Sequence, residues 1–183
     1  MNDGSNMPDR VDERQVRIEP WTAGDLDVLR RNNAPEMMAH LGGPETDEQL
    51  IARHERYLAL NDRDTGQMFR IVLPAEGIAV GGIGVWDSEW RDEAVYETGW
   101  SVISEFQGRG IATAAIGLVA AHARAEGRHQ YLHAFPSVEN GPSNAICRKA
   151  GFTLIGDHDE AYPPGSTNWM RMNEWRLDLQ TDD

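Results

Sequence analysis

Apolar residues recur along the chain with the periods of strands and helices, and these periods predict the first elements. Every second residue is apolar in Gln15–Glu19, which predicts a short strand. Helical spacing follows in Ala23–Asn33 and again in Thr46–Leu60, where Thr46 is the N-cap candidate. Residues 40–44, between the two, contain two glycines and a proline and are expected to form a loop.

Three strand-like stretches follow the second helix. They are expected at Met68–Leu73, Ile78–Trp86 and Ala94–Ile103. Turn-forming residues fill the gaps between them, at Pro74–Gly77 and Asp87–Asp92. Because these connections are short, we expect the three strands to form an antiparallel meander.

The second half of the chain alternates between helices and strands. Gly110–Glu126 is small and apolar around most of its circumference, which predicts a buried helix, and Gly127 suits its C-cap. The whole order is β-α-α-β-β-β-α-β-α-β-β, typical of an α/β architecture with a mixed sheet. The remaining elements are expected at Tyr131–Phe135 (strand), Ser143–Ala150 (helix), Phe152–Ile155 (strand) and Trp169–Leu179 (strand).

The chain of 183 residues is long enough for one domain with a substantial core. Residues 15–180 carry the periodic patterns, whereas Met1–Arg14 is polar and is expected to be a disordered tail. Thirty acidic residues against 17 basic ones give a net charge of −13. This balance argues against binding to nucleic acid, which needs clustered Lys and Arg. It favours a cationic substrate through electrostatic steering, although solubility alone would also explain it.

Several classes of protein are excluded by simple absences in the sequence. No apolar run approaches the roughly 18–20 residues of a membrane-spanning helix, and Met1–Arg14 lacks the apolar segment of a signal peptide. We therefore expect a cytoplasmic protein with no membrane partner. The single cysteine, Cys147, excludes an intrachain disulfide and a Cys-rich metal site. His129 and His133 would share a face on a helix, but their segment is predicted as a strand, so we expect no metal site.

A glycine-containing turn connects the predicted strand Ala94–Ile103 to the predicted helix Gly110–Glu126. Backbone N–H groups in such a turn and in the first turn of a helix form a concave site for anions. Gly108 and Gly110 carry no side chain that would hold a phosphate away, and Thr113 can add a hydroxyl. The turn lacks the Gly-Lys-Ser/Thr of a P-loop and the third glycine of a dinucleotide site. A tight turn without a ligand would need the same glycines.

Two segments together resemble a known family. Residues 107–112 read Gln-Gly-Arg-Gly-Ile-Ala and match the Gln-x-x-Gly-x-Ala acetyl-CoA pyrophosphate loop of the GNAT superfamily of N-acetyltransferases. Asn140–Phe152 resembles the family's Asn-x-x-Ser-x5-Lys-x-Gly-Phe segment, and the order of elements between the two also matches. The likeness covers residues 15–180. Glu97–Trp100 is similar to a Glu-x-Gly-aromatic strand in the branch that acetylates the N-termini of ribosomal proteins.

The resemblance implies a single-domain α/β fold. Its sheet would be mixed and mostly antiparallel, flanked by helices, with two central strands that splay apart. Acetyl-CoA would be the acyl-donor co-substrate, and its pantetheine would lie between the strands Ala94–Ile103 and Tyr131–Phe135, pairing with backbone like an added strand. Ser143 is also an N-cap candidate for the short helix. The cofactor-binding residues that the resemblance implies are Val102, Ile103, Gln107, Gly108, Arg109, Gly110, Ile111, Ala112, Thr113, Asn140 and Ser143.

The implied reaction moves an acetyl group from acetyl-CoA to a primary amine by direct attack in a ternary complex. Glu97 is the candidate general base, with a solvated strand carboxylate as the alternative role. His133, on the neighbouring strand, is the second candidate base or else a packed polar residue. Cys147 stands where many family members have a tyrosine that protonates the CoA thiolate. A thiol with a pKa of about 8.5 could replace that tyrosine, although a buried cysteine is more often structural.

The acceptor is less well defined by the sequence than the donor. A small-molecule amine and a peptide N-terminus both remain open, and a non-catalytic acyl-CoA-binding or sensing module is the alternative function. A homodimer is expected by analogy alone. The segments expected to flank the acceptor are His40–Pro44, Trp86–Trp90 and Pro163–Gly165. Nearby acidic residues would suit a cationic acceptor: Asp87, Glu89 and Asp92.

Overall fold

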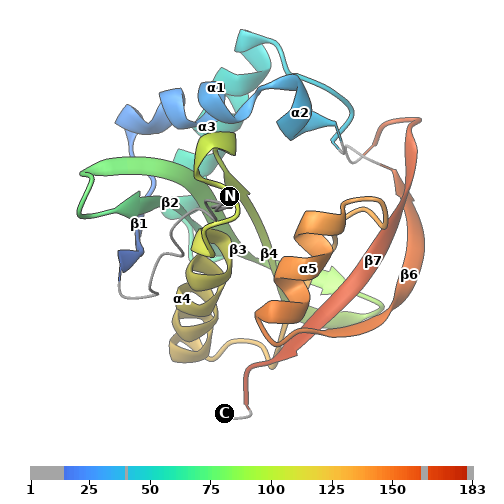
Figure 1. Cartoon of the computed structure of the whole chain (residues 1–183). Helices are drawn as coiled ribbons and strands as arrows, with labels where there is room; N and C mark the ends of the chain where they lie inside the picture. The colour runs from blue at the N-terminus through green and yellow to red at the C-terminus, as the bar shows by residue number, and fades with distance from the viewer. Residues whose placement is uncertain (1–14, 40, 162–164, 181–183) are drawn as a thin grey trace, which may run out of the picture.

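The computed structural model describes residues 15–39, 41–161 and 165–180 (Figure 1). The expected tail Met1–Arg14 lies outside the described residues, as do His40, Pro163 and Pro164 of the two expected acceptor loops. One sheet of seven strands runs through the described chain. The strands are β1 (Arg17–Pro20), β2 (Gly66–Leu73), β3 (Ile78–Trp90), β4 (Glu93–Val102), β5 (Tyr131–Ala134), β6 (Thr153–Ala161) and β7 (Trp169–Asp178).

The strand order in the sheet is β1-β2-β3-β4-β5-β7-β6. Strands β2 to β4 form the expected antiparallel meander, β1 pairs antiparallel with β2, and β5, β7 and β6 are antiparallel to one another. The pair β4–β5 is parallel, and α4 provides the connection that a parallel pair requires. The prediction of a mixed, mostly antiparallel sheet in an α/β fold is confirmed.

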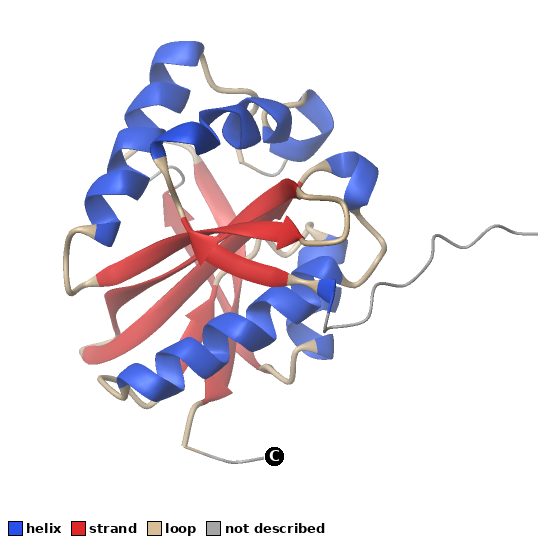
Figure 2. Cartoon of the chain, turned by 90° about the vertical axis from the view of Figure 1, so that its left-hand side faces the viewer, coloured by secondary structure: helices blue, strands red, loops and turns tan. Residues whose placement is uncertain are grey.

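Helices cover the sheet on both faces (Figure 2). α4 buries its small side chains against one face and forms the main core with β1 to β5. α1 and α3 pack on the other face around Trp21, Leu29 and Leu50. The α-helices are α1 (Leu26–Asn32), α2 (Pro35–Met38), α3 (Asp47–Asn61), α4 (Ile111–Glu126) and α5 (Gly141–Lys149), with 3₁₀ helices η2 (Ala23–Asp25) and η3 (Ser104–Phe106).

The ends of two helices follow the expected local chemistry. Thr46 caps α3 in a capping box with Gln49, and Gly127 ends α4 in the left-handed region, with φ 66°. The expected helix Ala23–Asn33 is instead divided into η2 and α1. Thr22 is the N-cap as expected, and the Asp25 carboxylate accepts bonds from its N–H and hydroxyl, at 2.7 Å each. The short α2 was not predicted.

The β3–β4 hairpin is longer than the pattern predicted. β3 continues through the expected turn to Trp90, and the real turn consists of Arg91 and Asp92. Both have positive φ, 51° and 66°, as a two-residue type I′ hairpin turn requires. The polar residues after Trp86 therefore belong to a strand, not to a loop.

The sheet curls strongly toward its β6 edge. β6 extends to Ala161, beyond its expected end at Ile155. His158 of β6 lies with its ring centroid 4.5 Å from that of Trp90 in β3, although three strands separate β3 from β6 in the sheet. Phe135, just after β5, packs against both rings, with its ring centroid 4.7 Å from that of Trp90 and 5.5 Å from that of His158. One face of this half of the sheet is therefore concave.

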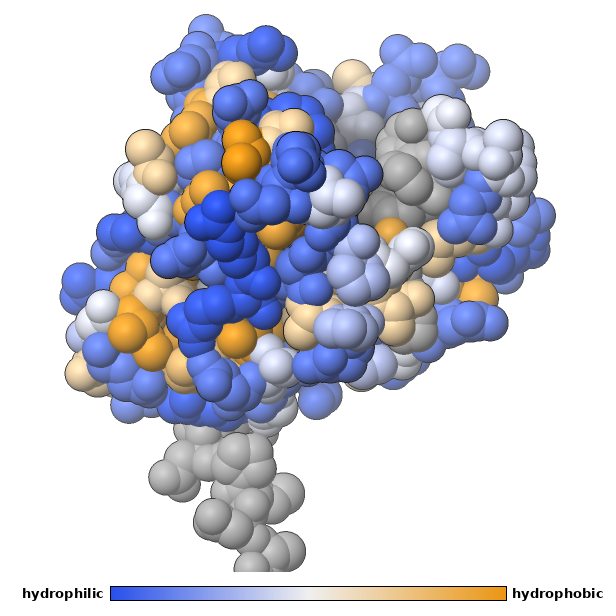
Figure 3. Space-filling model, turned by 90° about the horizontal axis from the view of Figure 1, so that it is seen from above, coloured by the Kyte–Doolittle hydropathy of each residue, from blue (hydrophilic) through white to orange (hydrophobic). Residues whose placement is uncertain are grey.

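The molecular surface seen from above is mostly hydrophilic, with apolar side chains in small groups between charged ones (Figure 3). This agrees with the high proportion of acidic residues. None of the helices in the described ranges is both long and apolar enough to cross a bilayer.

Candidate active site

The central strands β4 and β5 part from each other after two residue pairs. In the described residues their register joins Tyr96 to Leu132 and Glu97 to His133. Beyond Glu97, β4 stays paired with β3 as far as Val102, whereas β5 pairs with β7 on its other side. Within the described part of the chain, one backbone edge of β4 thus has no neighbouring strand from Thr98 to Val102. The gap that opens between β4 and β5, called the splay below, is about 17 Å long from Glu97 to Val102, at about 3.4 Å for each residue step.

The splay leads to the turn before α4. Two glycines shape this turn with φ in the left-handed region, 76° at Gly108 and 84° at Gly110, the N-cap of α4. The N–H of Ala114 donates to the Gly110 carbonyl at 3.1 Å, which is the first i→i−4 bond of the helix. The N–H groups of the three preceding residues therefore have no intrahelical acceptor. With the positive end of the helix dipole, these N–H groups have the chemistry that an anion site requires, and the phosphate role expected of them stays a prediction.

Contacts outside the turn hold its two long side chains. Gln107 Nε2 donates to the Val102 carbonyl at 2.9 Å and lies 2.9 Å from the sulfur of Met37 in α2. Arg109 forms an ion pair with Glu76 at 3.2 Å. Gln107 thus ties the turn to β4 and α2, and Arg109 lies at the rim of the turn.

The two residues expected to pair with pantetheine differ in where their backbone points. The N–H of Ile103 donates to the Val80 carbonyl at 2.9 Å, so it belongs to the ladder with β3. Successive residues of an antiparallel strand direct their backbone groups to opposite sides, so those of Val102 face the splay. The expectation is therefore corrected: Val102 has its backbone groups on the side of the splay and Ile103 does not.

The second motif segment begins α5 beside the splay. Asn140 is the N-cap of α5, because its Oδ1 accepts the N–H of Ser143 at 3.0 Å. The capping role expected for Ser143 therefore belongs to Asn140. Ser143 is half-buried in the first turn.

The buried Asn144 is the centre of a hydrogen-bond network that the sequence analysis missed. Its Nδ2 donates to the carbonyls of Ser137 and Asn140, at 2.9 and 2.8 Å. Its Oδ1 accepts from Asn173 at 2.7 Å and from the indole of Trp175 at 2.8 Å. These bonds fix the start of α5 to β7 and so hold one wall of the splay.

Asn144→Ala is expected to lower the free energy of unfolding by about 2–3 kcal/mol, because it leaves the buried Trp175 N–H and the Ser137 carbonyl without their partner. Lys149→Ala, at an exposed position of the same helix, should change it by less than about 0.5 kcal/mol. Urea unfolding measures both. Equal stabilities of the two variants would contradict the structural role given to Asn144.

Glu97 lies where β4 and β5 part. Ser88 Oγ donates to its Oε2 at 3.0 Å, and the Trp86 side chain also hydrogen-bonds the carboxylate. Burial raises the pKa of Glu97 above its ordinary value. These two hydrogen bonds oppose that rise, and the charge of Glu160 adds to it. A carboxylate with a raised pKa is better matched to accepting a proton near neutral pH.

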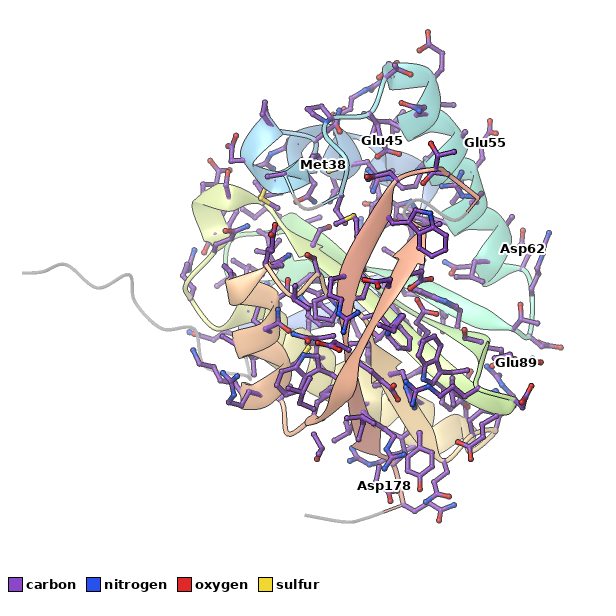
Figure 4. The ribbon with its side chains drawn as sticks, turned by 90° about the vertical axis from the view of Figure 1, so that its right-hand side faces the viewer. Met38, Glu45, Glu55, Asp62, Glu89 and Asp178 are labelled. Carbon is purple, nitrogen blue, oxygen red and sulfur yellow. The ribbon has the colours of Figure 1, made fainter. Side chains whose placement is uncertain are left out.

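Acidic and aromatic side chains share the concave face with Glu97. Glu160, on β6, pairs with the His158 imidazole at 3.2 Å. Glu174, on β7, is 3% exposed and lies beside His133. Figure 4 shows the β6–β7 hairpin in front of this face, with side chains crowded behind it. Carboxylates among aromatic rings suit a cationic ligand.

Figures 1 and 4 show α2 on the same side of the molecule as the adjoining ends of β6 and β7. Met38 and Glu45, labelled in Figure 4, belong to this region. Trp169, the first residue of β7, has 68% of its surface exposed there. The segments expected to flank the acceptor, His40–Pro44 and Pro163–Gly165, lie only partly within the described residues, so their role stays a prediction.

One acidic residue expected near the acceptor lies elsewhere. Asp87 accepts from Arg128 and pairs with His129, both at 3.0 Å, next to the end of α4. Side chains alternate along β3, so Asp87 points to the side opposite Glu97. Glu89 and Asp92 are exposed. The acidic character of the concave face comes instead from β4, β6 and β7.

Cys147 lies on the buried face of α5, in the core, with 0% of its surface exposed. Burial raises the pKa of its thiol to about 12. Such a group is poorly suited to protonating a thiolate, so the position favours the packing role that the sequence left open. Cys147→Ala is expected to keep kcat within about twofold and to cost about 1 kcal/mol of stability. A tenfold loss of kcat in a steady-state assay would contradict this.

A match to a family model identifies the family to which the chain belongs. Residues 15–153 match the model of the acetyltransferase (GNAT) domain family. The chain belongs to the GNAT acetyltransferase family. It is an acetyl-CoA-dependent acetyltransferase, and acetyl-CoA fits its residues: free helix N–H groups for the phosphates lie beside an unpaired strand edge for the pantetheine.

Solved GNAT structures show the same fold at low identity. An acetyltransferase from Bacillus anthracis has a TM-score of 0.75 and 20% identity, covering 91% of this chain and 96% of that one. A Salmonella typhimurium acetyltransferase that modifies the N-terminal serine of a 50S ribosomal subunit protein has 0.72 and 17%, covering 90% and 95%. Spermidine N-acetyltransferase from Vibrio cholerae, in complex with CoA and spermine, has 0.71 and 16%, covering 91% and 96%. No curated protein matches the chain.

Proposed function

We propose that this GNAT enzyme acetylates a cationic primary amine, either a small amine or a peptide N-terminus, by direct attack in a ternary complex. The observation that carries the proposal is one continuous path. The free N–H groups before Ala114 lead along the open edge of β4 to Glu97, at the border of an acidic and aromatic face. A donor held along this path would present its thioester to an amine on that face.

The cofactor contacts are part of the proposal. Backbone N–H groups from Gly108 to Thr113 would hold the diphosphate, and the backbone N–H of Val102, whose carbonyl accepts from Gln107, would pair with pantetheine. Asn140 and Ser143 would lie along the arm on the α5 side. Holding donor and acceptor together supplies much of the rate through orientation.

Glu97 is proposed as the general base. The amine nitrogen forms a bond to the acetyl carbon as the carbon–sulfur bond breaks, so the nitrogen must shed protons. The need for a base depends on the amine. A lysine-like ammonium with a pKa of about 10.4 is neutral about once in 2,500 at pH 7, whereas an α-amino group with a pKa of about 7.8 is neutral about one time in seven.

Both kinds of acceptor have relatives among the similar structures, one acting on a protein N-terminus and one named for spermidine. In this chain, Glu97, Glu160 and Glu174 approach the same concave face from three strands. That charge supports an acceptor that binds as a cation. It is the reason for proposing a cationic amine rather than an amine of any charge.

Thiol release from acetyl-CoA tests the proposal with three acceptor panels: peptides with free N-termini, polyamines and aminoglycosides. We expect release that depends on one panel and saturates with it. A non-catalytic acyl-CoA-binding module would gain thermal stability from acetyl-CoA without releasing thiol. A ligand at 100 times its Kd adds about 2.7 kcal/mol, so this binding is measurable. Binding without release in any panel would contradict the proposed function.

A further inference from the structure

A second titratable site lies next to Glu97 on the concave face. His133 of β5 is the register partner of Glu97, so the two side chains leave adjacent strands on the same face. His133 Nδ1 lies 3.8 Å from Glu174 Oε1, and the two residues are 2% and 3% exposed. Glu97, His133 and Glu174 thus lie on the three neighbouring strands β4, β5 and β7.

The imidazole of His133 has unused hydrogen-bonding capacity. Neither of its ring nitrogens has a hydrogen-bond partner in the part of the chain that the structure describes. The 3.8 Å to Glu174 is within ion-pair range but too long for a hydrogen bond. Buried polar groups are almost always satisfied, so an orphaned buried imidazole beside the Glu174 carboxylate and next to Glu97 in the sheet points to a transient partner.

The reaction has a proton to dispose of. An ammonium acceptor loses two protons when it becomes an amide; one ends on the CoA sulfur and the other must leave the site. Glu97, half-buried and hydrogen-bonded to Ser88, can hold that proton once. A new turnover needs Glu97 ionised again.

We propose that His133, supported by Glu174, takes over the proton that Glu97 removes from the amine and so returns Glu97 to its ionised form. The inference rests on the proposed amine acetylation. The proton leaves Glu97 for a ring nitrogen of His133, and the other ring nitrogen releases one toward Glu174. Arg91, 60% exposed and 3.1 Å from Glu174 Oε2, marks the solvent end of the row. His133 acts through Glu97 and is therefore a positioning residue.

Surrounding groups keep His133 ready to accept a proton. Burial lowers its pKa, so the ring is neutral near pH 7 before the reaction. The charges around it act in both directions, because Glu174 and Glu93 raise its pKa whereas Arg176 and Arg91 lower it. The other groups that face it are Glu97 from β4 and Tyr131 and Phe135 from its own strand and its continuation.

Buffer rescue separates proton transfer from packing. His133→Gln removes the titrating ring, and His122→Gln, a half-buried histidine on α4, is the matched control. In weak buffer we expect His133→Gln to lower kcat about tenfold or more without changing the KM for acetyl-CoA. Concentrated imidazole buffer should restore most of the loss, while the native enzyme and His122→Gln should not respond. A kcat within twofold of native, or a loss that buffer does not relieve, would overturn the proposal.

A titration that needs no turnover keeps this result distinct from the proposed function. The imidazole signals of His133 are followed by NMR against pH in the native protein and in Glu97→Gln. Removing the Glu97 charge should lower the His133 pKa, since the imidazolium loses a nearby anion. Identical titrations would overturn the coupling between the two residues. Failure of the native enzyme to release thiol would instead overturn the proposed function.

Discussion

Glu97→Gln is expected to lower kcat by about 10²–10⁴-fold, the contribution of a positioned base. Gln has the same shape and can still accept the Ser88 bond, so the variant removes basicity and little else. In the native enzyme, kcat/KM should fall as pH drops through the raised pKa of Glu97, because the base becomes protonated. That acid limb should be missing in the variant. A pH–rate profile with an alkylamine acceptor measures both effects.

The same substitution is expected to lower activity but to raise stability at neutral pH. The folded-state pKa of Glu97 is raised above its unfolded value, so its contribution to stability is lost as pH rises through the folded pKa. Glu97→Gln should therefore have a higher Tm than the native protein at pH 7 and no advantage below about pH 4. The exposed Glu89→Gln is the control for both measurements (Figure 4). Activity within twofold of native in Glu97→Gln would remove Glu97 from the mechanism.

Gly110→Ala is expected to raise the KM for acetyl-CoA by about 10-fold or more. Gly110 has φ 84° at the N-cap of α4, where an added Cβ is strained by about 1–2 kcal/mol and lies next to the N–H groups that face the diphosphate. A shift that loses one charge-assisted hydrogen bond costs about 1.5–3 kcal/mol of binding. Steady-state kinetics with acetyl-CoA as the varied substrate measures the change.

Gly127→Ala is the matched control, because Gly127 has φ 66° at the other end of the same helix. Its Cβ would meet only the Arg124 carbonyl, at 3.8 Å. The control should lose comparable stability and keep its KM for acetyl-CoA. Equal KM values for the two variants would show that backbone strain in α4, rather than the phosphate contacts, limits binding.

Elements with strong local signals were predictable from the sequence. Capping chemistry alone predicted the start of α3 at Thr46 and the end of α4 at Gly127. The hairpin after Trp90 was not predictable in the same way, because Arg91 and Asp92 adopt positive φ, which non-glycine residues rarely do. The four-residue α2 has too few turns to show a helical period.

The donor half and the acceptor half of the site also differ in how well local sequence predicts them. Most of the donor half lies in two contiguous segments, residues 107–113 and 140–152, so two motifs together could indicate it. The concave face depends on the curl of the sheet, which brings His158 of β6 to Trp90 of β3. Glu160 and Glu174 were missed for this reason, since an alternating polar strand gives no sign of which distant strand it will face. A cytoplasmic location and a homodimer stay predictions.

The central claim is that the backbone at the start of α4 binds the diphosphate of acetyl-CoA. A crystal structure of the enzyme with acetyl-CoA tests it most directly. The account predicts phosphate oxygens within about 3.2 Å of backbone nitrogens between Gly108 and Thr113, with the pantetheine along the open edge of β4 and the thioester near Glu97. A diphosphate bound elsewhere on the molecule, with side chains occupying this turn, would contradict it.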